Sequence, residues 1–293
     1  MLAVSEVTAG FGLALAAAGC YELSYAGQAL EARATDVGQA RRPSLLLTLA
    51  RRPLWAGAIA LAIVAFGLQV GALHFAPLTL VQPTLALGLL LLLVLGVRVL
   101  GEPVGRREIA ATLAVLVGVA GVALAAPERS DSVAGVVPVG AVLGALLLAT
   151  LLPYLGAARP WRLAAGAGAA DAFAGIAAKL ISFELDRGRL LLALAWAAGA
   201  GVTTLIGLTS ETSALQRLPA TRVAPVVLVM QIGLPTLAAP LVARESWAGT
   251  PLGGAPLIVS LALLGVGVAL LGTSVPVARL AARRQEAEHG GGR

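Results

Sequence analysis

Nine apolar segments, each long enough to cross a lipid bilayer as a helix, make up most of this sequence. A helix needs about 20 residues to traverse the roughly 30 Å hydrocarbon core of a bilayer. The segments of that length are approximately residues 8–30, 53–75, 77–99, 107–126, 134–156, 162–183, 189–212, 218–243 and 254–276. The sequence therefore predicts an all-α integral membrane protein with about nine transmembrane helices.

The composition agrees with a lipid environment. The chain is 58% hydrophobic and 12% charged, whereas a soluble domain is typically about 25% charged. The net charge of +6 is expected to set the orientation in the membrane and does not indicate nucleic-acid binding. Cys20 is the single cysteine, which excludes an internal disulfide and a cysteine metal cluster. No cofactor is expected.

The arginines predict how the chain is oriented. With nine spans and a cytoplasmic linker at residues 31–52, only four arginines fall on the outer side, while the other sixteen fall on the inner side. The four are Arg129, Arg187, Arg189 and Arg244. Cytoplasmic loops of membrane proteins carry such an excess. We expect a multi-pass plasma-membrane protein with its N-terminus outside and its C-terminus in the cytoplasm.

The 31–52 linker contains an apolar stretch, Leu45-Leu46-Leu47, that is too short to span the membrane. It is expected to lie in the headgroup plane as a short amphipathic helix. The tail at residues 279–293 is charged, ends in glycines and is predicted to be disordered.

A sequence repeat divides the chain into two related parts. Residues 69–83 recur without a gap at residues 211–225, with matching alanine, leucine, proline, threonine and valine positions. A glycine-rich motif at residues 118–124 likewise recurs at 265–270. Equivalent helices are five spans apart, and because five is odd the two parts must have opposite orientations. We expect a first half at residues 1–132, with four helices, and a second half at 133–278, with five. Inverted repeats are typical of secondary transporters, whose binding sites lie near the membrane midplane.

These motifs resemble those of the drug/metabolite transporter superfamily. The resemblance rests on Ala72-Leu-His-Phe-Ala-Pro-Leu-Thr-Leu-Val-Gln-Pro83, on Leu100-Gly-Glu102 after the next apolar span, and on the Gly-x-x-Gly-Val helix that follows. Arg52-Pro-Leu-Trp-Ala-Gly57 and Leu80-Val-Gln-Pro83 look most like the branch that includes the NIPA-type magnesium transporters. The resemblance implies two inverted five-helix halves, of which the first is one helix short here. The second half carries Arg244-Glu245 where the first carries the Gly-Glu pair.

Ionisable side chains inside a membrane are costly and usually functional, so the first candidates lie in the segment at residues 8–30. Glu22 is at the edge of a polar stripe with helical i, i+3, i+4, i+7 spacing. The stripe consists of Tyr21, Ser24, Tyr25 and Gln28. Glu22 is predicted to face a cavity, where it would carry a proton or bind a cation. The alternative is a structural hydrogen-bond cluster. A weak alignment of the two halves places Glu22 opposite Asp171.

The second half supplies the other charged candidates. Asp171 lies in mid-span among small residues and is either a cavity carboxylate or the partner of Lys179 two turns away. Lys179 itself either snorkels to the membrane surface or takes part in binding. Glu211, in a hydroxyl-rich stretch, is a candidate for cation contact or an ordinary solvated helix end. Its repeat counterpart is Gln69, and Gln82 precedes a helix-kinking proline and can satisfy exposed carbonyls.

The sequence thus favours an alternating-access carrier for a small polar metabolite, a drug or a cation. A NIPA-like Mg²⁺ transporter is the alternative, since carboxylates and water bind that ion, although the sequence leaves any metal ligand unknown. A non-transporting scaffold is a further alternative. The sequence leaves open whether the protein forms a homodimer. A membrane-embedded enzyme is disfavoured because no acidic metal-binding motif is present. Near the inner membrane edge, Glu102 is expected to form a loop ion pair with Arg106.

Overall fold

The computed structural model describes residues 4–75, 78–125, 134–156, 159–242 and 250–272, and within these ranges the chain is helical with no strand. The first-half helices are α1 (Val4–Arg33), α2 (Pro43–Ala50), α3 (Pro53–Phe75), α4 (Leu78–Ala86), α5 (Gly88–Arg98) and α6 (Arg106–Ala125). The second-half helices are α7 (Val136–Leu151), α8 (Pro160–Asp186), α9 (Leu190–Leu215), α10 (Ala220–Val242) and α11 (Ala255–Gly272). Short 3₁₀ turns lie at Val37–Gln39, Leu152–Tyr154 and Pro251–Gly254.

Helices occupy the described parts of all the segments predicted from the sequence. Six of them are long and apolar enough to cross a membrane, or seven if α2 and α3, which meet at a bend of 94°, are counted as one span. The prediction of an all-α membrane protein is therefore confirmed at this level, and the count of nine spans stays a prediction. The tail predicted to be disordered, residues 279–293, lies outside the described residues.

The segment at 77–99 is divided into α4 and α5 by a turn at Leu87. Pro83 lies inside α4 and cannot donate a backbone hydrogen bond, and Gly88, a weak helix former, opens α5. The two helices that result, of 9 and 11 residues, are each shorter than a full span. This turn brings a glycine to the middle of the bundle, where it faces α1.

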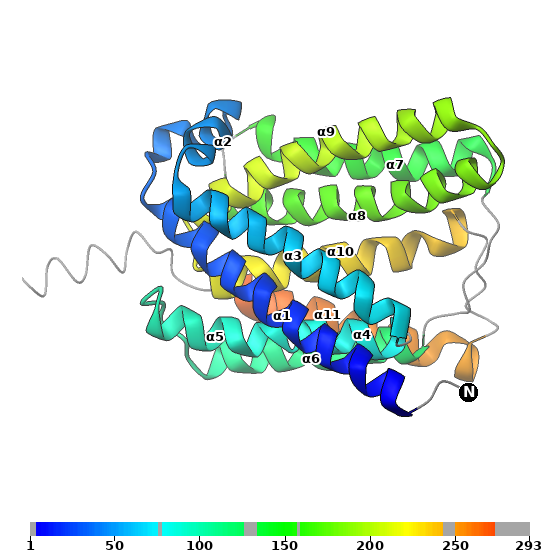
Figure 1. The fold of residues 1–293 in the computed structure, drawn as a ribbon, viewed down its shortest axis with the longest axis horizontal. Helices are drawn as coiled ribbons and strands as arrows, with labels where there is room; N and C mark the ends of the chain where they lie inside the picture. Colours follow the sequence, from blue (N-terminus) through cyan, green and yellow to red (C-terminus); the bar gives the residue numbers. More distant parts are fainter. Residues whose placement is uncertain (1–3, 76–77, 126–133, 157–158, 243–249, 273–293) are drawn as a thin grey trace, which may run out of the picture.

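The helices lie side by side along the long axis of the molecule, and the chain reverses direction at each end (Figure 1). The packing pairs are regular. α1 packs along α3 as α8 packs along α9, and α6 packs along α11. In the same way α1 contacts α4 and α5 while α8 contacts α10, and α4 contacts α6 while α10 contacts α11. These contacts thus recur between the helices that the sequence repeat makes equivalent, whereas the contacts of α7 with α8 and α10 have no first-half counterpart among the described helices.

The α6–α11 contact is built from the repeated glycine motifs. A Cβ at Gly118 would lie 2.7 Å from Leu264, and one at Gly267 would lie 2.6 Å from Val115. Leu264 and Val115 are 1% and 0% exposed. The two backbones approach this closely because the positions carry no side chain, a common device for packing helices in lipid.

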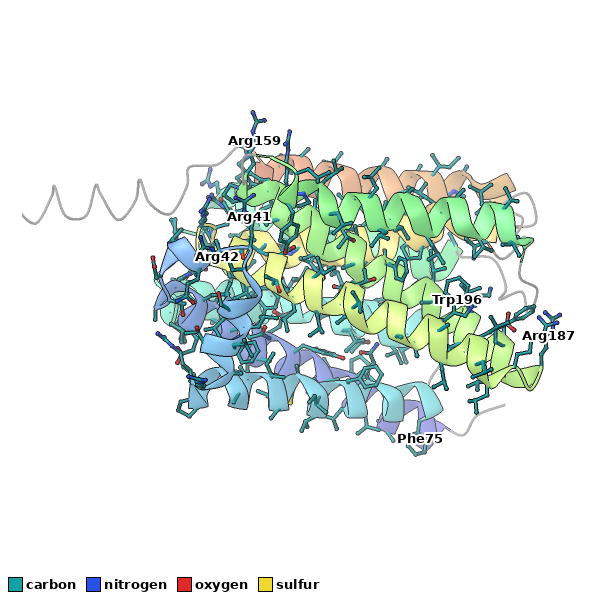
Figure 2. All side chains as sticks on the ribbon, turned by 90° about the horizontal axis from the view of Figure 1, so that it is seen from above. Arg41, Arg42, Phe75, Arg159, Arg187 and Trp196 are labelled. Atoms are coloured by element: carbon teal, nitrogen blue, oxygen red, sulfur yellow. The ribbon has the colours of Figure 1, made fainter. Side chains whose placement is uncertain are left out.

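One end of the molecule is strongly basic. Arg41, Arg42 and Arg159 lie at this end, whereas Arg187 lies at the opposite one (Figure 2). The linker between α1 and α3 crosses the basic end. Its helix α2 packs Leu45 and Leu49 against Leu208 of α9, so the apolar stretch rests on the protein.

Candidate functional site

The polar stripe of α1 faces the protein interior. Leu23 is 50% exposed on the opposite face, whereas Ser24 is 1% exposed and Gln28 is 7% exposed. Ser24 donates to the carbonyl of Ala58 on α3 at 2.7 Å, and Gln28 donates to Ser24 at 3.1 Å. Ser24 therefore joins α1 to α3, and Gln28 supports Ser24 from one turn along α1.

Tyr21 makes a further link between the same helices. Its hydroxyl donates to Oε1 of Gln69 on α3 at 2.8 Å. Both residues are partly buried, so the pair retains some exposed polar surface. Tyr21 and Gln69 can serve as hydrogen-bonding groups at the border of the site.

Glu22 lies next to the turn between α4 and α5. The residue is 9% exposed, and its Oε2 atom is buried without a hydrogen bond from the described protein. A Cβ at Gly88 would lie 3.0 Å from both Cγ and Oε1 of Glu22, so glycine leaves the space that this carboxyl group occupies. A buried carboxyl oxygen without a hydrogen bond is costly unless a proton or a cation completes it.

Tyr25 connects Glu22 with two carboxyl groups of the second half. Its hydroxyl lies beside Glu211 of α9, outside ordinary hydrogen-bond geometry, and within electrostatic reach of Glu22 and Asp171. Asp171 of α8 is in turn within electrostatic reach of Glu211. We call Glu22, Tyr25, Asp171 and Glu211 the acidic cluster. It draws on α1, α8 and α9, and thus on both halves of the chain.

Two members of the cluster keep some accessible surface in spite of their depth. Asp171 and Glu211 are of intermediate exposure, although protein surrounds them on nearly all sides. Both carboxyl-bearing residues thus retain part of their surface accessible.

The helix rise places Glu22 and Asp171 at the same distance from the basic end. Glu22 precedes the end of α1 at Arg33 by eleven residues, and Asp171 follows the start of α8 at Pro160 by eleven residues. At about 1.5 Å per residue, this distance is roughly 16 Å, about half the thickness of a hydrocarbon core. The weak sequence alignment of Glu22 with Asp171 thus agrees with their equal depth.

The remaining sequence candidates are less central. Lys179 is partly buried on α8, two turns beyond Asp171, so its pairing with Asp171 stays a prediction. The side chain of Gln82 lies outside the described residues. Among the described residues, no group of three or more histidine, cysteine, aspartate or glutamate side chains is arranged to hold a metal ion.

Glu102 has a role that the sequence did not reveal. Its side chain is 1% exposed and pairs with Arg33, so the expected pairing with Arg106 is wrong. Its oxygens also accept from the backbone of Ala220 at 2.6 Å and of Thr221 at 2.9 Å, and from the Thr221 hydroxyl at 2.6 Å. The carboxylate thereby caps the first N–H groups of α10, where a negative charge is favoured. The partners lie 118 and 119 residues away, a separation without a local sequence signal.

A second ion pair lies one turn away. Arg222 of α10 donates to Glu108 of α6 at 2.8 Å, and the two side chains are 5% and 8% exposed. Glu108 also accepts from the backbone N–H of Gly105 at 2.9 Å, at the start of α6. The Glu102 cap and the Arg222–Glu108 pair both join a first-half element to α10 at the basic end.

Comparison with known proteins finds no matching family model, no matching curated protein and no matching solved structure. The acidic cluster and the sequence repeat are therefore the features from which a function can be inferred.

Proposed function

We propose that this protein is a secondary transporter that moves a small cation across the membrane by alternating access. The acidic cluster is the observation that carries the proposal. Three carboxyl groups from three helices and both halves converge around one tyrosine, at a depth where unpaired charges are excluded unless they have a function.

The helix arrangement supports a carrier with an inverted repeat. The α1–α3 and α8–α9 pairs pack alike, and the repeated glycine motifs of α6 and α11 pack on each other. Equivalent helices run in opposite directions in Figure 1. On this proposal the halves at residues 1–132 and 133–278 rock against each other around the cluster. Nine helices would cross the membrane, as in a drug/metabolite transporter that lacks one helix.

The chemistry of the cluster favours a cation with hydrogen-bonding groups, such as a small organic amine. Carboxylates attract the positive charge, and the faces of Tyr21 and Tyr25 suit a cationic group. The hydroxyl groups of α9 lie along the same helix as Glu211. We favour an organic cation over Mg²⁺ because the described carboxyl groups surround Tyr25 and are not arranged as a metal cluster.

The basic end supports an orientation. The arginine-rich end that contains Arg41, Arg42 and Arg159 (Figure 2) would face the cytoplasm of a plasma-membrane protein. The N-terminus would then be outside and the C-terminus inside. Protease or thiol-reagent accessibility of tagged termini in sealed vesicles tests this orientation.

Flux into proteoliposomes tests the function. The purified protein is reconstituted and supplied with radiolabelled organic amines, neutral metabolites and Mg²⁺, with and without a proton gradient. We expect saturable amine uptake that is abolished by Glu22→Gln and by Asp171→Asn. Glu184→Gln is the matched control, because Glu184 pairs with Arg189 at 3.5 Å far from the cluster.

The outcomes separate the alternatives. Uptake of Mg²⁺ alone would favour the NIPA-like alternative, and absence of flux for every class would favour a scaffold. Full activity in both cluster variants would refute the role of the acidic cluster.

A further inference from the structure

The segment between α1 and α2 joins the two halves at the basic end. The backbone N–H of Arg41 donates to the Ser213 hydroxyl on α9 at 2.9 Å. The Arg41 guanidinium donates to the carbonyls of Pro153 at 3.2 Å and Gly156 at 2.9 Å, both in the turn after α7. One residue of the first half thus makes three hydrogen bonds to the second half.

The other end of the same segment makes a further link. Gln216, at the end of α9, donates to the carbonyls of Thr35 at 3.4 Å and of Asp36 at 3.3 Å. Residues 34–42 therefore run from the end of α1, across the end of α9, to the turn after α7. We call them the latch segment.

The backbone conformation of Arg41 indicates a residue that is held in place by its contacts. Its φ is +65°, in the left-handed region that residues other than glycine adopt at a cost. The surrounding hydrogen bonds hold it there. Arg42, the next residue, is exposed and extended, so the two neighbouring arginines differ in role.

We propose that the latch segment is a releasable lock on the basic end, which keeps α1 against α9 until its contacts break and the substrate passes to that side. The inference rests on the proposed alternating access. When the halves rock so that the site opens to the basic end, α1 and α9 must separate there. The contacts are polar, and water or arriving substrate can replace them when they open. Arg41 is a positioning residue in this scheme and does not touch the substrate.

A cleavable cross-link tests the lock. In a Cys20→Ser background, which removes the single native cysteine, Asp36→Cys and Gln216→Cys are joined with a short bis-methanethiosulfonate reagent. We expect the cross-linked protein to stay folded and to lose flux in proteoliposomes, with recovery after dithiothreitol. The same variant without cross-linker is the control. Unaltered flux in the cross-linked protein would overturn the proposal, because it would show that the contact between residues 36 and 216 does not need to open during transport.

A labelling experiment measures release without depending on flux. Thr212 is fully buried and its hydroxyl has no hydrogen bond in the structure, so Thr212→Cys is a mild reporter next to Ser213. In the Cys20→Ser background, Arg41→Ala should raise the maleimide labelling rate by about tenfold, because it removes two hydrogen bonds made by a charged group. Arg42→Ala should leave the rate unchanged.

Equal labelling rates in the Arg41 and Arg42 variants would overturn the lock. If the wild-type protein moved no tested substrate, the proposed function would fail, while the labelling rates would still decide whether the latch opens. If Arg41→Ala did not fold, the cross-link would decide instead.

Discussion

The ion pair between Arg222 and Glu108 offers a quantitative test of how the halves are joined. Both side chains are almost fully buried, at 5% and 8% exposure. Arg222→Met leaves Glu108 with the backbone N–H of Gly105 and without its cationic partner. Removing one member of a buried pair typically costs about 3–5 kcal/mol. Glu108→Gln should cost a similar amount for the same reason.

The double variant Arg222→Met/Glu108→Met should be much milder than either single change. It removes both charges together, and the remaining loss is the cap on Gly105, worth about 1 kcal/mol. Thermal unfolding in mild detergent, followed by the helical circular dichroism signal, measures these costs. At about 2 °C per kcal/mol, each single variant should melt roughly 6–10 °C below the wild type. If the double variant instead loses the sum of the two single losses, the two residues are not energetically coupled and our account of the α6–α10 contact is wrong.

Three further perturbations test separate features. Glu102→Ala leaves buried N–H groups at the start of α10 without an acceptor and should lower the free energy of unfolding by about 3 kcal/mol or more. Thr221→Val removes one hydroxyl hydrogen bond and should lower it by about 1.5–3 kcal/mol. Equal melting temperatures for both variants and the wild type would refute the cap. Gly118→Leu has no room against α11 and should destabilise by about 1–3 kcal/mol, while Gly144→Leu, with nothing within 4 Å of its added Cβ, should leave the melting temperature unchanged. Tyr25→Phe keeps the ring and removes the hydroxyl beside Glu211, so we expect weaker substrate affinity in the flux assay at an unaltered melting temperature; wild-type affinity would exclude the hydroxyl from binding.

The sequence predicted the positions of the helices well because lipid demands long apolar runs. It was less successful at their ends. The segment ending at residue 212 was predicted to stop in a hydroxyl-rich stretch, but α9 continues to Leu215. The hydroxyls of Thr209 and Ser213 bond to the carbonyls of Leu205 at 2.8 Å and of Thr209 at 2.6 Å within the helix itself. Polar residues whose hydroxyls bond to carbonyls of the preceding turn can lie inside a helix, so they do not mark its end.

The candidate site, too, could be predicted from the sequence only in part. The polar stripe and the mid-span carboxyl groups could be found from their helical spacing and the cost of charge in lipid. The sequence could not show which of these side chains are already engaged in hydrogen bonds within the protein. Ser24 bonds to α3 and Gln28 bonds to Ser24, while one oxygen of Glu22 has no hydrogen bond from the described residues. That distinction depends on the distance between α1 and its neighbours, which no local pattern encodes.

The cap on α10 has a consequence for the order of assembly. Glu102 receives its backbone donors from residues that are synthesised 118 and 119 positions later. While the ribosome makes the intervening helices, this carboxylate has Arg33 as its partner and the first turn of α10 does not yet exist. The basic end of the protein therefore reaches its final form late in biosynthesis, and a nascent chain that stops before Ala220 leaves this carboxylate without its backbone donors. Completion of the first half and insertion of the second are in this way chemically linked.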